Sequence, residues 1–268
     1  MTDHNEATQQ LHQITSTSPL HAAYNWDLSV FDAQRWIKNT FAKPRATRYP
    51  IKMLRYWFMY NLIREEQIRL GRSLRVCEIG VDQGQMLRFM RDAGFTDIDC
   101  WVAVDCKLQP ELAESGYSRQ IEANVDSPDF CLDEQYDVII VLHLLEHLFE
   151  PEMLVQRLTA ALMPNGVLIG GFPATPEWIE SYWQKRIRLT ALKFGHVSVF
   201  SPQRVRNMAK SCKLNLNFIS GAFLLRKSGS FLENLKGWLR FNLLWGAFFP
   251  ALSGEIYWSM RKSIATKN

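Results

Sequence analysis

A loop that combines glycines with acidic residues is the part of the sequence best suited to ligand chemistry. It follows an apolar run, begins with Glu78-Ile79-Gly80, continues through Asp82 and ends at Gly84. Gly80 lets the backbone turn sharply against a ligand, and Gly84 lets a helix begin close to it. A second acid, Asp105, ends the next apolar run, about where a ribose-binding carboxylate lies in a dinucleotide fold. This spacing predicts a site for a cofactor that contains a nucleoside.

The acidic start of the loop distinguishes between two cofactor classes. A dinucleotide needs a glycine pattern that presents amides to a pyrophosphate, normally G-x-G-x-x-G. Here the pattern is G-x-x-x-G and begins after Glu78, whose carboxylate would repel a pyrophosphate but suits a cation. S-adenosylmethionine carries a sulfonium and an amino group and no phosphate. The loop therefore favours S-adenosylmethionine, and an NAD-dependent oxidoreductase stays as the alternative.

Alternating apolar runs and helical patterns predict the elements that hold these residues. Strands are expected at 75–80, 99–105, 119–122, 136–145 and 167–172, with helices before, between and after them that include 51–70, 151–162 and 176–194. This alternation is typical of βαβ units with a parallel sheet covered on both faces. Two further runs, LNLNFISG and AFLLR, predict an antiparallel hairpin at a sheet edge.

Composition and pattern divide the chain into four parts. We expect a mobile tail at 1–25, an N-terminal helical extension at 26–72, the ligand-binding domain at 73–228, and an aromatic, basic helical segment at 229–268. The extension should hold a short amphipathic helix at 27–43 before the helix at 51–70.

Seven motifs occur in the order found in one large enzyme family. They are Glu78-Ile79-Gly80 with Gly84, Val104-Asp105, Asn124-Val125-Asp126, Tyr136–Ile140, Leu145–Leu148, Leu162–Leu168 and Gly195–Pro202. Over 74–226 the chain resembles the class I S-adenosylmethionine-dependent methyltransferases, and its last motif is similar to the histidine segment of the ubiquinone-methyltransferase-like subgroup. The resemblance implies a Rossmann-like α/β fold with a seven-stranded, mostly parallel sheet flanked by helices.

The resemblance also implies roles for individual residues. The expected cofactor-binding residues are Glu78, Ile79, Gly80, Gly84, Asp105, Cys106, Asn124, Val125, Leu142 and His143. His196 and His147 are the candidates for a general base. Two departures from the family pattern, Asp82 for a glycine and Asn124 for an acid, keep a non-catalytic binding module as an alternative.

The spacing of His143, Glu146 and His147 could hold a metal ion. We expect none, because a histidine stands at the first position where related enzymes have a carboxylate. We expect Glu146 and His147 to cap a helix and pack against the sheet instead.

Composition and charge limit the partners. The chain is 47% hydrophobic and 22% charged, which excludes a disordered chain or a simple coiled coil. Its five cysteines include no C-x-x-C pair, so neither a disulfide framework nor a structural zinc site is expected. No secretory signal and no apolar run long enough to cross a membrane is visible.

An acidic centre lies between two basic flanks. Residues 76–176 hold 17 acidic and 5 basic residues, whereas 177–268 hold 4 acidic and 15 basic ones. The flanks predict contact with something anionic, and aromatic residues spaced through 231–249 favour a membrane surface or a lid over nucleic acid. We expect a cytoplasmic protein, peripheral at the inner face of a membrane, that methylates a small-molecule, glycan or lipid-linked acceptor.

Overall fold

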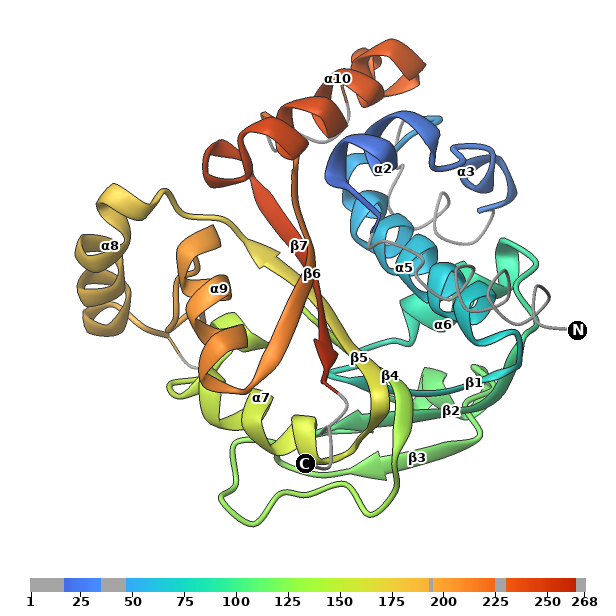
Figure 1. Cartoon of the computed structure of the whole chain (residues 1–268), viewed down its shortest axis with the longest axis vertical. Helices are drawn as coiled ribbons and strands as arrows, with labels where there is room; N and C mark the ends of the chain where they lie inside the picture. The colour runs from blue at the N-terminus through green and yellow to red at the C-terminus, as the bar shows by residue number, and fades with distance from the viewer. Residues whose placement is uncertain (1–16, 35–46, 193–194, 225–229, 264–268) are drawn as a thin grey trace, which may run out of the picture.

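A seven-stranded sheet with helices on both faces forms the centre of the molecule (Figure 1). The structure is a computed structural model and describes residues 17–34, 47–192, 195–224 and 230–263. The strands are β1 (Leu74–Ile79), β2 (Ile98–Asp105), β3 (Arg119–Glu122), β4 (Tyr136–Leu142), β5 (Leu162–Pro173), β6 (Leu214–Ala222) and β7 (Glu255–Lys262). They lie in the order β3-β2-β1-β4-β5-β7-β6, with β7 antiparallel to both of its neighbours. The expected α/β fold with a seven-stranded, mostly parallel sheet is confirmed.

Eight α-helices are described. They are α2 (Pro19–Asn25), α3 (Val30–Ala33), α5 (Leu54–Leu70), α6 (Gln85–Asp92), α7 (Pro151–Ala160), α8 (Glu177–Leu189), α9 (Pro202–Ser211) and α10 (Lys236–Phe248). Short 3₁₀ turns are η1 (Ile51–Met53), η2 (Pro110–Glu114), η3 (Leu145–His147), η4 (Phe231–Asn234) and η5 (Pro250–Leu252). The helix expected at 51–70 is confirmed as η1 followed by α5.

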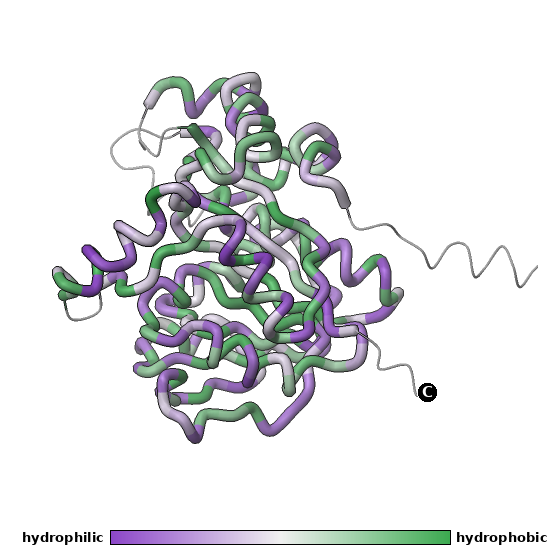
Figure 2. Tube along the Cα trace, turned by 60° about the vertical axis from the view of Figure 1, so that its left-hand side comes forward, coloured by the Kyte–Doolittle hydropathy of each residue, from purple (hydrophilic) through white to green (hydrophobic). Residues whose placement is uncertain are grey.

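The two faces of the sheet bury separate hydrophobic clusters. Successive strand residues point to opposite faces, so Val138 and Ile140 of β4 join one cluster, while Ile139 and Val141 join the other. Residues of α2, α3, α5, α6 and α10 complete the first cluster, and those of α7 and α9 complete the second. The tube in Figure 2 shows the hydrophobic strands inside and more hydrophilic segments around them.

The last strand corrects two predictions. Residues 255–262 were expected to be helical, but they form β7, which lies between β5 and β6. The expected edge hairpin is also wrong in its described part, because β6 pairs with β7, and Phe223 and Leu224 after β6 form no strand. The rest of the expected second strand, 225–226, lies outside the described residues. The run Glu255-Ile256-Tyr257-Trp258 is buried on both sides of the strand. Without the polar and apolar alternation of a half-buried strand, it could be read as either strand or helix.

The N-terminal extension is part of the main hydrophobic core. Trp26, which follows α2, packs edge-on against Trp57 and Phe58 of α5 and stacks on Phe218 of β6. The tail expected at 1–25 is therefore wrong for 19–25, which form α2. Residues 1–16 and 35–46, which contain most of the expected helix at 27–43, lie outside the described residues.

Helix α10 covers the β6 end of the first face. Leu239 and Leu243 are buried, and the helix contacts both β6 and α2. A Cβ atom added at Gly246 would lie 1.9 Å from the backbone oxygen of Gly221 in β6, so the close approach of helix and strand requires glycine here. Arg240 donates hydrogen bonds to the backbone oxygens of Ala23 and Trp26 at 2.6 and 2.9 Å. Among the described residues, no helix is long and apolar enough to cross a membrane.

Candidate functional site

The loop between β1 and α6 has the tight turn that its sequence predicts. Gly80, Asp82 and Gly84 all have left-handed backbone conformations, with φ of 77°, 48° and 70°. Aspartate tolerates this conformation better than most residues, so Asp82 keeps the turn without a glycine. The backbone N–H of Asp82 donates to Oδ2 of Asp105 at 3.0 Å, which ties the loop to the end of β2.

A large cavity opens at the carboxyl ends of β1, β2 and β4. Its volume is about 1050 Å³, and its lining combines the loop, the ends of the strands and the segment after α8. Seven of the predicted site residues line it: Gly80, Asp105, Cys106, Asn124, Val125, His143 and His147. Ligands of open α/β sheets bind at this edge. The structure thus brings together residues that are far apart in the sequence.

A smaller cavity of about 280 Å³ adjoins the first, and Gly80, Asp82 and His143 line both. Glu78 and Leu142 line the smaller cavity, together with Arg55 and Tyr56 of α5. The contribution of α5 was not expected, because the extension carries no motif of its own. Two predicted cofactor-binding residues line neither cavity. Ile79 is buried in the core, and a Cβ atom at Gly84 would lie 3.0 Å from Leu112.

Glu78 is a buried acid with two fixed donors. The indole of Trp101 and the hydroxyl of Tyr117 donate to its Oε2 at 3.2 and 2.8 Å. Burial raises the pKa of Glu78 to about 8, although both hydrogen bonds favour the charged form. Without a bound cation, Glu78 is therefore mostly protonated at neutral pH.

His143 lies between two buried carboxylates. Its Nδ1 is 3.0 Å from Oε1 of Glu146, and its Nε2 is 3.4 Å from Oε2 of Glu255. Burial lowers the pKa of His143, but the two carboxylates more than compensate, so the net shift is upward. Arg55 completes the group, 3.1 Å from Oε1 of Glu255.

Sequence reasoning missed Arg55 and Glu255. They are brought to His143 by α5 and by β7, two elements distant from the motifs. In the sequence, the one signal for Glu255 was its position as an acid at the start of an otherwise apolar run. The backbone of His143 is itself left-handed, with φ of 54°, which turns the chain directly after β4.

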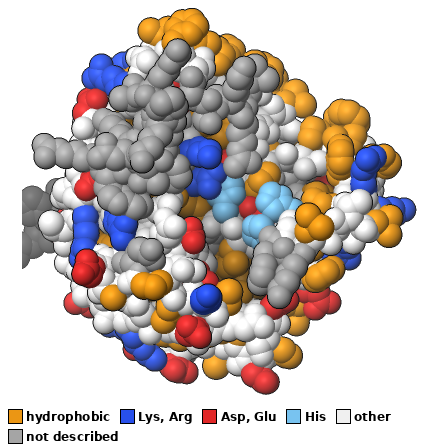
Figure 3. Space-filling model, turned by 180° about the vertical axis from the view of Figure 1, so that it is seen from behind, with side chains coloured by type: hydrophobic (Ala, Val, Ile, Leu, Met, Phe, Trp, Pro, Cys, Tyr) orange, Lys and Arg blue, Asp and Glu red, His pale blue; other side chains and the backbone are white. Residues whose placement is uncertain are grey.

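The two predicted general bases lie together. The rings of His147 and His196 are 4.9 Å apart, edge to face, and Nδ1 of His147 is 3.2 Å from the backbone oxygen of Gly195. Figure 3 shows histidine side chains gathered near the centre of the face seen from behind. A third cavity of about 370 Å³ lies here, lined by His196, Glu146 and three apolar residues of α8: Ile179, Trp183 and Ile187.

The metal-binding arrangement considered from the sequence is not the one that forms. His143 contacts Glu146 and Glu255, whereas ligand atoms of Glu146, His147 and His196 all lie within 4.8 Å of one another. These three could hold a cation, and His196 comes from a segment not included in the sequence argument. The expected helix cap is wrong, because Glu146 and His147 lie in η3, before α7 begins at Pro151.

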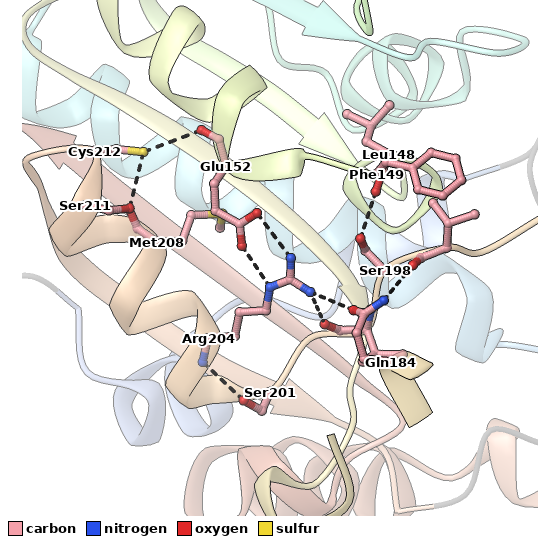
Figure 4. Close-up of polar contacts among 12 residues, drawn as sticks. Leu148, Phe149, Glu152, Gln184, Ser198, Ser201, Arg204, Met208, Ser211 and Cys212 are labelled. Carbon is pink, nitrogen blue, oxygen red and sulfur yellow. Dashed lines mark hydrogen bonds and ion pairs between the residues drawn. The ribbon is translucent and has the colours of Figure 1, made fainter. Parts of the chain in front are cut away.

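Helix α8 is held over the third cavity by a polar clamp (Figure 4). The amide of Gln184 donates to the backbone oxygen of Val197 at 2.7 Å and accepts from the backbone N–H of Val199 at 3.1 Å. Arg204 of α9 donates to Gln184 at 3.0 Å and pairs with both carboxylate oxygens of Glu152 at 2.8 and 3.1 Å. The clamp joins α7, α8 and α9 at the wall of the cavity.

The fold is found in solved structures of low sequence identity. An S-adenosylmethionine-dependent methyltransferase from Mesorhizobium loti aligns with a TM-score of 0.52 and 15% identity, over 77% of this chain and 97% of that one. The [4+2]-cyclase SpnF aligns with a TM-score of 0.53 and 14% identity, over 94% and 98%. A complex of the Haloferax volcanii Trm112 methyltransferase activator with a putative methyltransferase aligns with a TM-score of 0.52 and 15% identity, over 74% and 85%.

A search of curated proteins finds no match. Residues 32–217 match the family model described as a methyltransferase domain, which covers more than half of the chain. Neither the NAD-dependent oxidoreductase nor the non-catalytic module is retained. The chain belongs to the methyltransferase domain family and is an S-adenosylmethionine-dependent methyltransferase.

Proposed function

We propose that this methyltransferase acts on a small molecule with an apolar body, of the lipid-linked kind among the acceptors expected from the sequence. The observation that carries the proposal is the meeting of three cavities around His143 and Glu146. His143 lines the two cavities next to the glycine loop, and its partner Glu146 lines the apolar cavity beneath α8. Donor and acceptor would thus meet at this pair.

The residues around the first two cavities fit the cofactor. Asp105 ends β2 beside Asn124 and Val125, and its carboxylate suits a pair of ribose hydroxyls. Glu78, Asp82 and Leu142 line the smaller cavity, where acids suit a positively charged methionine end. Cys106 would lie beside the adenine. S-adenosylmethionine supplies a methyl group on a positively charged sulfur atom.

The chain's own groups would hold the acceptor and take its proton. If Nδ1 of His147 carries its proton and donates to Gly195, then Nε2 is left unprotonated and can accept one. His196 lies in ring contact with His147 and lines the apolar cavity, so it is the second candidate. The apolar walls of that cavity would exclude water from the reacting group.

The placement in the ubiquinone-methyltransferase-like subgroup is also a proposal. It rests on Gly195–Pro202, the segment that contributes His196, Ser198 and Val199 to the apolar cavity. An acceptor with a flat ring would suit walls made by Trp183, Ile179 and Ile187.

Ligand-induced thermal stabilisation tests the cofactor assignment. S-adenosylhomocysteine at about 1 mM should raise the melting temperature, since a hundredfold excess over a dissociation constant of ~10 μM stabilises the native state by about 2.7 kcal/mol. NAD at the same concentration is the control and should have no effect. A shift with NAD alone would contradict the proposed cofactor site.

A further inference from the structure

We propose that the outer face of α8, together with Phe149 and Leu192 from the rim of the large cavity, is a docking surface for an anionic lipid bilayer. The argument for bilayer binding depends only on the residues of this surface and not on the proposed function. The consequence that an amphiphilic acceptor enters α8's cavity from the bilayer rests on the proposed function.

Helix α8 has two apolar faces but no buried residue. Ile179, Trp183 and Ile187, at spacings of four, form the inner face and line the acceptor cavity. Trp178, Tyr182 and Leu189 follow one another at spacings of four and seven, so they share a second, outer face, about 120° around the helix from the first at about 100° per residue. A solvated surface helix needs the inner face only.

The outer face is more exposed than apolar side chains of this size usually are. Trp178 is 81% exposed, Leu189 87% and Leu192 80%, while Tyr182 and Phe149 are more than half exposed. Figure 3 shows a group of hydrophobic side chains with adjacent basic ones at the edge of the molecule, beside the histidines. A contiguous apolar group of this kind marks an interaction surface.

Basic residues lie among these apolar side chains. Lys185 falls on the same side of the helix as Trp178 and Leu189. The guanidinium of Arg186 is 5.6 Å from the ring of Trp183, and that of Arg188 is 5.9 Å from the ring of Phe149. Tryptophan, tyrosine and leucine with lysine and arginine beside them are typical of helices that lie in a membrane interface. Within α8 the three basic residues outnumber the two acidic ones, Glu177 and Glu180, so the helix has a net attraction to anionic lipid.

The clamp fixes which face of α8 points outward. Gln184 lies on the inner half of the helix, where it bonds the backbone of Val197 and Val199 and contacts Arg204 (Figure 4). Arg188, which donates to the backbone oxygen of Phe149 at 3.0 Å, is a second anchor. Held in this way, the helix keeps its inner face over the cavity and presents the outer face away from the domain. A lipid-linked acceptor could then pass along α8 from the bilayer into the cavity beneath this helix.

Sedimentation with vesicles tests the surface. The probes are unilamellar vesicles of phosphatidylcholine alone and of equal parts phosphatidylcholine and phosphatidylglycerol. The full chain should pellet with the anionic vesicles about fivefold more than with the neutral ones, since one net basic charge near an anionic surface adds about 1 kcal/mol. The double variant Trp178→Ser with Leu189→Ser should lose this pelleting, and Lys185→Glu should reduce it.

A matched control substitutes exposed apolar residues elsewhere. Ile68 of α5 and Met153 of α7 are 57% and 47% exposed, and Ile68→Ser with Met153→Ser should pellet like the unchanged protein. Stabilisation by S-adenosylhomocysteine, measured on every variant, shows whether the fold and the cofactor site are intact.

Equally weak pelleting with both vesicle types would overturn the proposal, and self-association through this face would then identify a protein partner instead. Unchanged pelleting of the α8 variant would overturn it too and move the contact to another surface. Vesicle binding without any effect of S-adenosylhomocysteine would support the surface and contradict the proposed function.

Discussion

Glu78 couples cofactor binding to pH. Its pKa of about 8 in the free protein exceeds the ordinary value for a glutamate because the carboxyl is buried. A cation in the adjoining cavity would favour the charged form, so binding of S-adenosylmethionine should release a proton. Affinity should rise nearly tenfold from pH 6 to pH 7 and level off above pH 8, as expected for one proton. Calorimetry in two buffers of different ionisation enthalpy measures the proton release.

The same residue makes the free protein less stable as pH rises. The folded pKa lies above the unfolded one, so the native state holds more protons between about pH 4.5 and pH 8. The contribution of Glu78 to the free energy of unfolding is fully present below pH 4.5 and is lost as pH rises through 8. Glu78→Gln should remove both the proton release and this part of the pH dependence. Proton release that persists in Glu78→Gln would assign it to another group.

Asp105 is the second residue whose role can be isolated. Asp105→Ala removes the acceptor for the backbone N–H groups of Asp82 and Lys107, at 3.0 and 3.3 Å, and the proposed ribose contact. S-adenosylhomocysteine should bind more weakly by about 1.5–3 kcal/mol, as for a hydrogen bond to a charged group. Asp129→Ala, at an exposed acid, is the control for the change of charge. If both variants bound S-adenosylhomocysteine with equal affinity, Asp105 would serve only to hold the loop between β1 and α6 and would not contact the ribose.

At the level of elements, contact between α10 and β6 depends on Gly246. Gly246→Ala places a methyl group against the backbone of Gly221 and should destabilise the protein by about 1–3 kcal/mol, the usual range for an overpacked core. Gly237 lies in the same helix with nothing within 4 Å of an added Cβ, so Gly237→Ala should be neutral or stabilising by up to about 1 kcal/mol. Denaturant unfolding compares the two. Similar effects would show that the close approach is relaxed in solution.

The position of β7 inside the sheet lets us predict the outcome of a C-terminal truncation. A chain that ends before Phe231 lacks the strand that lies between β5 and β6. Both neighbours would lose their backbone partners on that side, so the truncated protein should not fold and should not bind S-adenosylhomocysteine. A helical segment that lay only on the surface could, by contrast, be removed without loss of binding. A melting transition that S-adenosylhomocysteine raises in the truncated chain would contradict it.

The sequence predicted most of the elements that carry motifs, and fewer of those that lack them. β1 to β5, the glycine loop and Asp105 follow from local patterns and from the family resemblance. β7 could not be predicted, because a strand buried on both faces has no alternation of polar and apolar residues. The contacts of Arg55 and Glu255 with the His143 site depend on elements whose packing no local pattern encodes. The pairing of His147 with His196 likewise appears only once the chain is folded.

On the scale of the whole molecule, we expect the N-terminal extension and the sheet to unfold as one cooperative unit. Trp26, α5 and β6 share a single hydrophobic cluster. Calorimetry should therefore show one unfolding transition. Trp26→Ala should shift that transition down, with a loss of about 3–5 kcal/mol typical of a large buried aromatic residue. Tyr24→Ala, at a side chain 62% exposed, should have little effect. A separate early transition would indicate that the extension unfolds alone.

The position of β7 also matters while the protein is being synthesised. β6 leaves the ribosome before α10 and β7, yet its partner in the sheet is β7. Translation adds about 5–20 residues per second, so the edge of β6 that pairs with β7 stays unpaired for a time on the order of seconds. During that time Phe218 and the apolar side of β6 are open to wrong pairing, which the nascent chain must avoid. By then β1 to β5, in the half of the sheet with the glycine loop, have already been synthesised with their parallel partners. This ligand-binding half can therefore form first and provide the edge on which β7 pairs.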